Sequence, residues 1–211
     1  MVKKLGLMGA LLFGATFAHG ATILLTPTDS TWLITADSTG EATPPTNASV
    51  VTTLGPGWGT AVSGSNWIGP NANQGNPPRA TNSFAGSTTY TTTFSLTNFQ
   101  TSGVTLSLSF LVDDYLTVYL NSLSNQIYST GACGNCYNSQ TNTGSIGLNQ
   151  ANLNAGTNTL LFVVQTIGGP TGLSLTGSVN ANPTGVPEPA TYAMMIAGLG
   201  AVAAFKRYRR A

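Results

Sequence analysis

The sequence predicts an all-β fold, an antiparallel β-sandwich, for residues 21–179. Short stretches rich in threonine, valine, leucine and aromatic residues alternate there with clusters of glycine, asparagine and proline. Runs with apolar residues at helical spacing are missing from the same region. Short strands separated by frequent turn residues are typical of all-β sandwiches and barrels.

The clearest expected strand is 104–112. Apolar residues occupy every second position and small polar residues lie between them, so we expect one buried face and one wet face. The apolar face consists of Val104, Leu106, Leu108, Phe110 and Val112. Further strands are expected at 31–35, 50–54, 88–96, 115–120, 159–165 and 173–179, and 159–165 is expected to be buried on both faces.

The composition is poor in charge. Only 6% of the 211 residues are charged, whereas a typical soluble domain has about 25%. The apolar fraction is 41%, which excludes the low-hydrophobicity composition of disordered chains. Uncharged polar residues therefore replace surface charge, which suits an exported domain in contact with glycans or other hydrated polymers.

The basic residues are concentrated at the two ends of the chain. Lys3 and Lys4 lie near one end and a basic cluster at 206–210 lies near the other. Between residues 21 and 185 the only basic residue is Arg79. The acidic residues of that region are Asp29, Asp37, Glu41, Asp113 and Asp114. Nucleic-acid binding needs clustered lysine and arginine to neutralise phosphates, so we expect no nucleic-acid partner.

Residues 1–20 have the pattern of a secretory signal peptide. Lys3 and Lys4 precede a short apolar run, and small residues stand before the expected cleavage between Gly20 and Ala21. The alternative is an N-terminal membrane anchor. That alternative is disfavoured because about 14 apolar residues fall short of the ~20 that a membrane span needs.

The C-terminal segment combines a proline motif, an apolar helix and a basic tail. Val186, Pro187, Glu188 and Pro189 follow a polar linker at 180–185 and lead into an uncharged stretch at 190–205. We expect 190–205 to be a transmembrane helix, since ~24 Å of helix with snorkelling basic ends approaches the ~30 Å hydrocarbon core. The basic tail, 206–210, is expected to stay cytoplasmic and to hold the chain at the membrane. Its members are Lys206, Arg207, Arg209 and Arg210.

This order of parts resembles the PEP-CTERM sorting signal over residues 186–211. The resemblance implies processing near Pro-Glu-Pro by an exosortase, a membrane-embedded enzyme. It further implies that the chain is exported, is anchored transiently in the inner membrane, and then reaches the envelope surface or extracellular matrix of a Gram-negative bacterium. The alternative is an ordinary single-span anchor in which the prolines only mark a turn beside the membrane.

The body resembles the galactose-binding-like jelly rolls found as carbohydrate-binding modules. The matching positions are Tyr90 and Phe94, Asp113-Asp114, Tyr119-Leu120-Asn121, and the segment 153–160. The chain departs from that pattern at Asn121-Ser122, where the family usually turns on Asn-Gly. The resemblance implies a jelly-roll-like sandwich, and such a fold does not fix the ligand.

The chain is not expected to be an enzyme. The single histidine, His19, lies in the signal peptide, so the mature chain lacks the side chain that serine-histidine catalysis and most zinc sites require. Asp113 and Asp114 are the only paired acids, and neighbours on a continuing strand would point to opposite faces. Two interpretations stay open for this pair. Either the two acids mark the end of a strand, or their carboxylates contribute ligands to a calcium site. Calcium is the one cofactor that we consider.

Cys133 and Cys136 are expected to form a local disulfide in an oxidising compartment. A zinc site would need four ligands, and a thioredoxin-like redox role would need a βαβ context.

Trp58 and Trp67, in glycine-rich loop-like sequence, are either platforms for glycan rings or caps on the ends of the sandwich core. The whole pattern favours a non-enzymatic surface or matrix protein, with a module that binds extracellular polysaccharide as the alternative.

Overall fold

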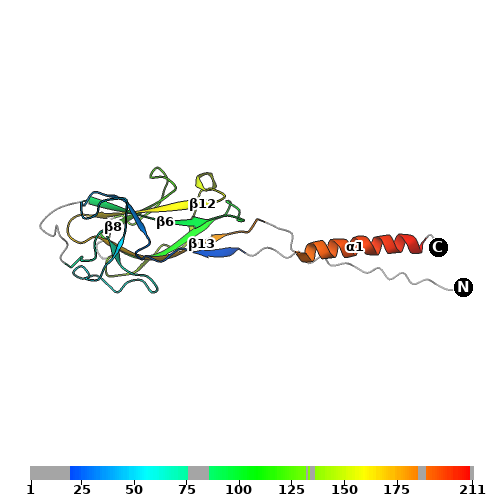
Figure 1. Cartoon of the computed structure of the whole chain (residues 1–211), viewed down its shortest axis with the longest axis horizontal. Coiled ribbons are helices and arrows are strands. Elements are labelled where there is room, and N and C mark those ends of the chain that lie inside the picture. Colours follow the sequence, from blue (N-terminus) through cyan, green and yellow to red (C-terminus); the bar gives the residue numbers. More distant parts are fainter. Residues whose placement is uncertain (1–19, 76–85, 132, 134–135, 185–188, 210–211) are drawn as a thin grey trace.

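The computed structural model describes residues 20–75, 86–131, 133, 136–184 and 189–209. It is a sandwich of two antiparallel β-sheets, followed by one helix, α1 (Pro189–Tyr208) (Figure 1). The predicted all-β antiparallel sandwich is therefore confirmed. Residues 1–19 of the expected signal peptide (1–20) and the Val186–Glu188 part of the proline motif lie outside the described residues.

The first sheet has seven strands in the order β10-β7-β13-β5-β4, with β1 on β13 and β11 on β7. Its long pair is β7 with β13, in register from Asp113 opposite Gly172 to Thr105 opposite Asn180. The strands are β1 (Ala21–Leu24), β4 (Ser49–Val50), β5 (Ile68–Gly69), β7 (Thr105–Asp113), β10 (Thr141–Asn142), β11 (Ile146–Gly147) and β13 (Gly172–Ala181).

The second sheet has six strands in the order β3-β2-β6-β12-β8-β9. β12 is central, pairing with β6 along one edge and with β8 along the other. The strands are β2 (Leu33–Asp37), β3 (Thr46–Asn47), β6 (Gly86–Ser95), β8 (Tyr115–Leu120), β9 (Gln126–Ser129) and β12 (Thr157–Thr166). A short 3₁₀ helix, η1 (Gln150–Asn152), precedes β12.

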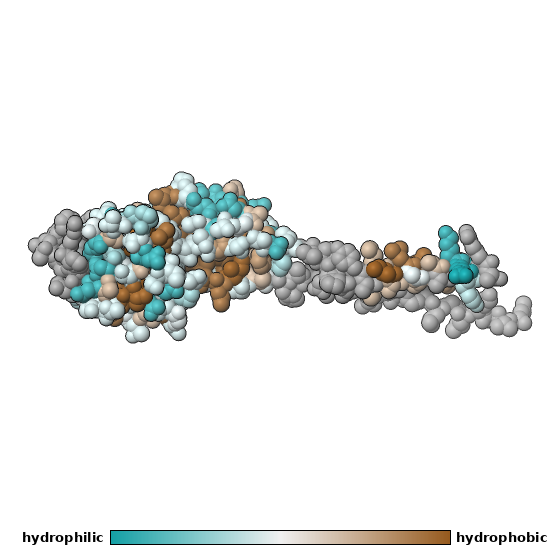
Figure 2. Space-filling view, in the orientation of Figure 1, coloured by the Kyte–Doolittle hydropathy of each residue, from teal (hydrophilic) through white to brown (hydrophobic). Residues whose placement is uncertain are grey.

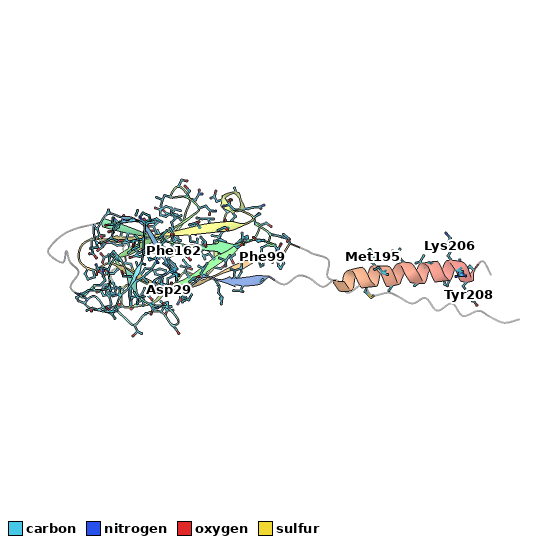
Figure 3. All side chains as sticks on the ribbon, viewed as in Figure 1. Asp29, Phe99, Phe162, Met195, Lys206 and Tyr208 are labelled. Carbon is cyan, nitrogen blue, oxygen red and sulfur yellow. A yellow bond between two sulfur atoms is a disulfide. The ribbon has the colours of Figure 1, made fainter. Side chains whose placement is uncertain are left out.

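The main core lies between the two sheets. Burial in β7 alternates from Thr105 to Phe110, so the predicted alternation is confirmed there, but Leu111 and Asp113 on the other face are buried as well. Phe162 of β12 is fully buried, and its ring lies 5.2 Å from that of Trp32 (Figure 3). Each such side chain contributes roughly 1.5–3 kcal/mol when it leaves water.

Strand β12 corrects one sequence prediction. The segment 159–165 was expected to be buried on both faces, but its burial alternates, and Leu161 and Val163 are only half-buried. The cause is that the six-stranded sheet covers the core with one face only, so every second residue of its central strand points away from the core.

The chain enters and leaves the sandwich at the same place. Ala21, the first residue of β1, is the register partner of Ala181, the last residue of β13. Beyond β13, Pro183 bridges Phe99, and the backbone N–H of Thr184 donates to the carbonyl of Asn98 at 2.8 Å. The sandwich thus extends to residue 184, and most of the linker expected at 180–185 belongs to it.

Helix α1 carries exposed apolar side chains along its middle and a basic last turn. Figure 2 shows this as a brown stretch that ends in teal, and Figure 3 shows Met195 and Lys206 projecting from the ribbon. Among the described residues, no helix is both long enough and apolar enough for a membrane span. The helix predicted at 190–205 is present within α1, and its crossing of a membrane stays a prediction.

Candidate functional site

The two tryptophans proposed as glycan platforms form a second, smaller core. Trp58 and Trp67 are 8% and 2% exposed, and their rings stack with centroids 4.1 Å apart. Trp67 Nε1 donates to the carbonyl of Gly59 at 2.9 Å. The rings pack with Val62 and with Leu111 of β7. Buried rings offer no face to a sugar, so of the two interpretations the structure supports the packing one.

Asp113 holds Trp58 in place. Trp58 Nε1 donates to Asp113 Oδ2 at 2.7 Å, in a buried position at the end of β7. Burial, and the hydrogen bond that protonated Asp113 donates to the neighbouring Asp114 carboxylate, raise the pKa of Asp113 to about 7, although the bond from Trp58 lowers it. The two carboxyls therefore interact with each other instead of facing apart, because the chain leaves the first sheet here and begins β8 at Tyr115.

Asp114 organises the loop after β12. Its Oδ2 accepts from the backbone N–H of Ile167 at 2.8 Å and from the Thr166 hydroxyl at 3.4 Å. Calcium takes six to eight oxygen ligands, and within the described ranges no three His, Cys, Asp or Glu side chains lie together. The Oδ2 atoms of Asp113 and Asp114 each hold a protein donor, and these contacts support the interpretation of the pair as the end of a strand. A share in a calcium site stays a prediction.

A second acidic residue, Asp37, caps the turn after β2. Its Oδ1 accepts from the hydroxyls of Thr39 at 2.7 Å and Thr88 at 2.9 Å. The Tyr90 hydroxyl is buried close by, and among the described residues it has no hydrogen-bond partner of good geometry. Burial, and then the charges of Asp37 and Glu41, raise the pKa of Tyr90 above its ordinary value.

Glu41 joins two loops at the same end of the sandwich. Its Oε2 accepts from the side-chain amides of Asn71 and Gln74. Gln74 is fully buried, and its Oε1 accepts from the backbone N–H of Thr171 at 2.9 Å. These acids were not singled out from the sequence, and both serve as acceptors that stabilise loops.

The predicted disulfide between Cys133 and Cys136 is present, with Cα atoms 5.6 Å apart. Cys136 is buried, and its carbonyl accepts from the backbone N–H of Val112 at 3.0 Å. The next residue, Tyr137, accepts from the N–H of Gly59 at 2.8 Å. The disulfide therefore holds the loop that fastens the Trp58 segment to the end of β7.

A shallow groove of about 270 Å³ lies on the first sheet. Four hydroxyl-bearing residues, two leucines and a glycine line it: Leu24, Ser107, Leu108, Ser109, Thr176, Gly177 and Ser178. No aromatic ring lines this groove. It offers hydrogen bonds but no stacking surface.

The second sheet presents two aromatic residues that the sequence did not single out as site residues. Tyr115 and Tyr119 of β8 are half-buried, while the alternate residues of the strand, Leu116, Val118 and Leu120, are fully buried. Both tyrosines therefore point away from the core. The signal was available in the strict alternation of 115–120, which puts tyrosine, threonine and tyrosine on one face.

Several solved structures are similar over the β-domain. A family 35 carbohydrate-binding module from an environmental isolate is 15% identical, with a TM-score of 0.37, over 78% of this chain and 99% of that one. A CBM35 from Cellvibrio japonicus Abf62 is 14% identical, with a TM-score of 0.38, over 78% and 100%. The arabinose-bound α-L-arabinofuranosidase MgGH51 is 13% identical, with a TM-score of 0.40, over 74% and 24%. Likeness at this level says nothing about ligand or activity.

The C-terminal segment gives a firmer comparison. A search of curated proteins finds no match. The large side chains of α1 are exposed, from Met194 to Phe205, and the guanidinium of Arg209 lies 5.0 Å from the centre of the Phe205 ring. Directly after the last residue held by the sandwich, residues 185–210 match the PEP-CTERM protein-sorting motif, so this chain carries a PEP-CTERM sorting segment.

Proposed function

We propose that the chain is an exported, non-enzymatic surface or matrix protein that an exosortase sorts and processes at Val186–Pro189. The observation that carries this proposal is the match of residues 185–210 to the PEP-CTERM sorting motif. After processing, the β-domain is released to the cell-envelope surface or to the extracellular matrix.

The fold supports a cut at this position. Every described residue of the main core lies at or before Ala181, and within the described ranges the last hydrogen bond to the sandwich is made by the N–H of Thr184. Cleavage just beyond Thr184 therefore removes nothing that the core needs. Pro187 and Pro189 lack backbone N–H donors and disfavour helix in the residues before them, which keeps the motif open to an enzyme.

Helix α1 supplies a means of holding the precursor at a membrane. Its exposed side chains include Met194, Met195, Ile196, Leu199, Val202 and Phe205. A cationic end of Lys206, Arg207 and Arg209 follows them. Apolar surface beside a basic cluster favours association with anionic lipid.

The absence of histidine after residue 20 and the structural use of the acids support a non-catalytic body. Asp113 is buried against Trp58, and Asp37 and Glu41 accept hydrogen bonds from neighbouring loops. None of these carboxylates is left in an open cleft as a general acid or base, which would need access to a substrate proton.

Sorting can be tested by expressing the full chain in a host with and without its exosortase. We expect mass spectrometry of the exported protein to show a new C-terminus between residues 184 and 190 only when the enzyme is present. Replacing Pro187, Glu188 and Pro189 together by alanine should leave a full-length, membrane-associated chain. Thr184→Ala is the matched control, because its contact is made by the backbone. Release of a chain that still ends at Ala211, equally in both hosts, would refute the proposal.

A second candidate function is binding of extracellular polysaccharide. The observation that favours it is a solvent-facing sheet surface made of tyrosine, threonine and glutamine without charge, on β6, β8 and β12. Retention of the processed protein on polysaccharide matrices, compared with a matrix-free control, tests this function. Passage through every matrix without retention would argue for a purely structural body.

A further inference from the structure

We infer that the outer face of the six-stranded sheet is the docking surface for a neutral polysaccharide, with the rings of Tyr115 and Tyr119 against the sugars. We call this surface the tyrosine face. The inference rests on the second candidate function and is independent of exosortase sorting.

One row of residues crosses the entire tyrosine face. Tyr119 is the register partner of Leu161 on one side and of Gln126 on the other. The row continues through β6, β2 and β3, and its members in order are Gln126, Tyr119, Leu161, Thr91, Leu33 and Asn47. Strands lie about 4.8 Å apart, so these six positions span about 24 Å. That length suits an extended chain of several sugars.

Parallel rows widen the surface. Thr117 lies between the tyrosines on β8, beside Val163 of β12, and its hydroxyl lies 3.5 Å from that of Ser129. Tyr115 lies beside Gln165. The two tyrosines are four residue steps apart along the strand, or about 13 Å, which lets them contact different sugars of one chain.

The residues of these rows select for an uncharged, hydroxylated partner. No aspartate, glutamate, lysine or arginine occurs among the described residues of the rows. A nucleic acid, an anionic lipid surface or a charged peptide would find no opposite charge here. Aromatic rings and aliphatic side chains match the apolar face of a pyranose, and threonine and glutamine match its hydroxyl groups.

Both tyrosines are pre-organised for binding. The inward-facing residues of the same strand, Leu116, Val118 and Leu120, are fully buried and fix the backbone of β8. A tyrosine ring has two side-chain torsions, so holding it against a ligand costs little conformational entropy. Within the described part of the chain, neither tyrosine hydroxyl has a hydrogen-bond partner in the protein, which leaves both free to bond a sugar.

The groove on the other sheet is the natural comparison site. It is lined by hydroxyl groups and Leu24, which is 79% exposed, but it has no ring. If hydroxyl groups alone were enough, ligand would bind there as well. Leu24→Ala therefore serves as a matched control for loss of an exposed apolar side chain outside the tyrosine face.

The test uses the processed protein and a panel of neutral polysaccharides (β-glucan, xylan, mannan and galactan) together with an acidic one, alginate. We expect the wild type to bind at least one neutral polymer. The double variant Tyr115→Ala/Tyr119→Ala should lose about tenfold or more in affinity, as expected when two stacking rings are removed. The Tyr→Phe pair, which keeps both rings, should lose less, and Leu24→Ala should bind as the wild type does. Circular dichroism and thermal unfolding verify that each variant is folded.

Three results would overturn the inference. Unchanged binding by a folded double alanine variant would mean that the site lies elsewhere while carbohydrate binding itself stands. Binding of alginate alone would contradict the neutral partner. No binding by the wild type, or a dimer that the double variant dissociates, would refute the carbohydrate function and assign the face to self-association.

Discussion

The indole N–H of Trp58 donates to the carboxyl of Asp113 at 2.7 Å, and this bond joins a long loop to the end of β7. The two residues are 55 positions apart in the sequence. The bond satisfies a buried donor and a buried acceptor at once, so each residue depends on the other.

Removing the carboxyl should destabilise the sandwich. We expect Asp113→Ala to lower the free energy of unfolding by about 1–3 kcal/mol, because the Trp58 N–H is then buried without an acceptor. Asp113→Asn, which retains an acceptor oxygen, should cost less at neutral pH. Urea unfolding of the three proteins measures this difference. Equal stability of the alanine variant and the wild type would contradict the assigned role.

The free energy of unfolding should depend on pH because of the titration of Asp113. The pKa is raised from its ordinary value of 3.8 to about 7, so the folded state binds this proton more tightly than the unfolded state. Stability from this group is therefore greatest below pH ~4, falls as the pH rises towards 7, and is level above that. Unfolding measured from pH 4 to 8 should show this decline in the wild type. Asp113→Asn should lack it, and a decline that persists in that variant would assign the proton to another group.

Gly172 should tolerate no side chain. A Cβ at that position would overlap the ring of Trp58, which packs directly against the glycine. We expect Gly172→Ala to lower stability by about 1–3 kcal/mol through overpacking. Gly147→Ala, also in a strand but with open space around the new methyl group, is the control and should stay within about 0.5 kcal/mol. Thermal unfolding of both variants tests the difference.

Replacing Tyr90 should have the opposite effect on the free energy of unfolding. Its hydroxyl is buried and, among the described residues, has no hydrogen-bond partner, so its desolvation is not compensated. Tyr90→Phe should therefore be neutral or stabilising, by up to about 1 kcal/mol. Tyr119→Phe, at a half-buried position on the outer face of its sheet, should leave stability unchanged. A clear loss of stability in Tyr90→Phe would show that the hydroxyl is satisfied, for example by a buried water molecule.

The disulfide between Cys133 and Cys136 should contribute modestly to the free energy of unfolding. A bridge across three positions constrains a short loop, for which the entropic stabilisation is about 2 kcal/mol. The double variant Cys133→Ser/Cys136→Ser should unfold at lower urea concentration but remain folded. Reduction of the wild type should produce the same shift. A loss of folded structure in either sample would mean that the loop is essential to the core.

The sequence predicts the elements whose patterns are local. The strict alternation of 104–112 identifies the inner face of β7, and 115–120 coincides with β8. The two cysteines of 133–136 also form their bond as expected. In each case the information lies within a few neighbouring residues.

Other features depend on contacts between distant residues. The apolar run around Leu161 and Val163 does not alternate in hydropathy, so its period could not reveal which residues face solvent. Trp58 stands in glycine-rich sequence typical of an open loop, yet packing against Trp67 buries it. Strands of two residues, such as β4 and β10, contain too few positions for any pattern.

The pairing of β1 and β13 at Ala21 and Ala181 has a mechanical consequence. While the precursor is tethered through its tail, drag on the body is transmitted along β13, which is flanked by β7 and β1 and is not an edge strand. Hydrogen bonds of antiparallel strands run perpendicular to the strand axis, so a pull along β13 loads many of them in shear at the same moment. The C-terminal segment thus follows a strand that is hydrogen-bonded on both sides, which protects the sandwich against mechanical unfolding.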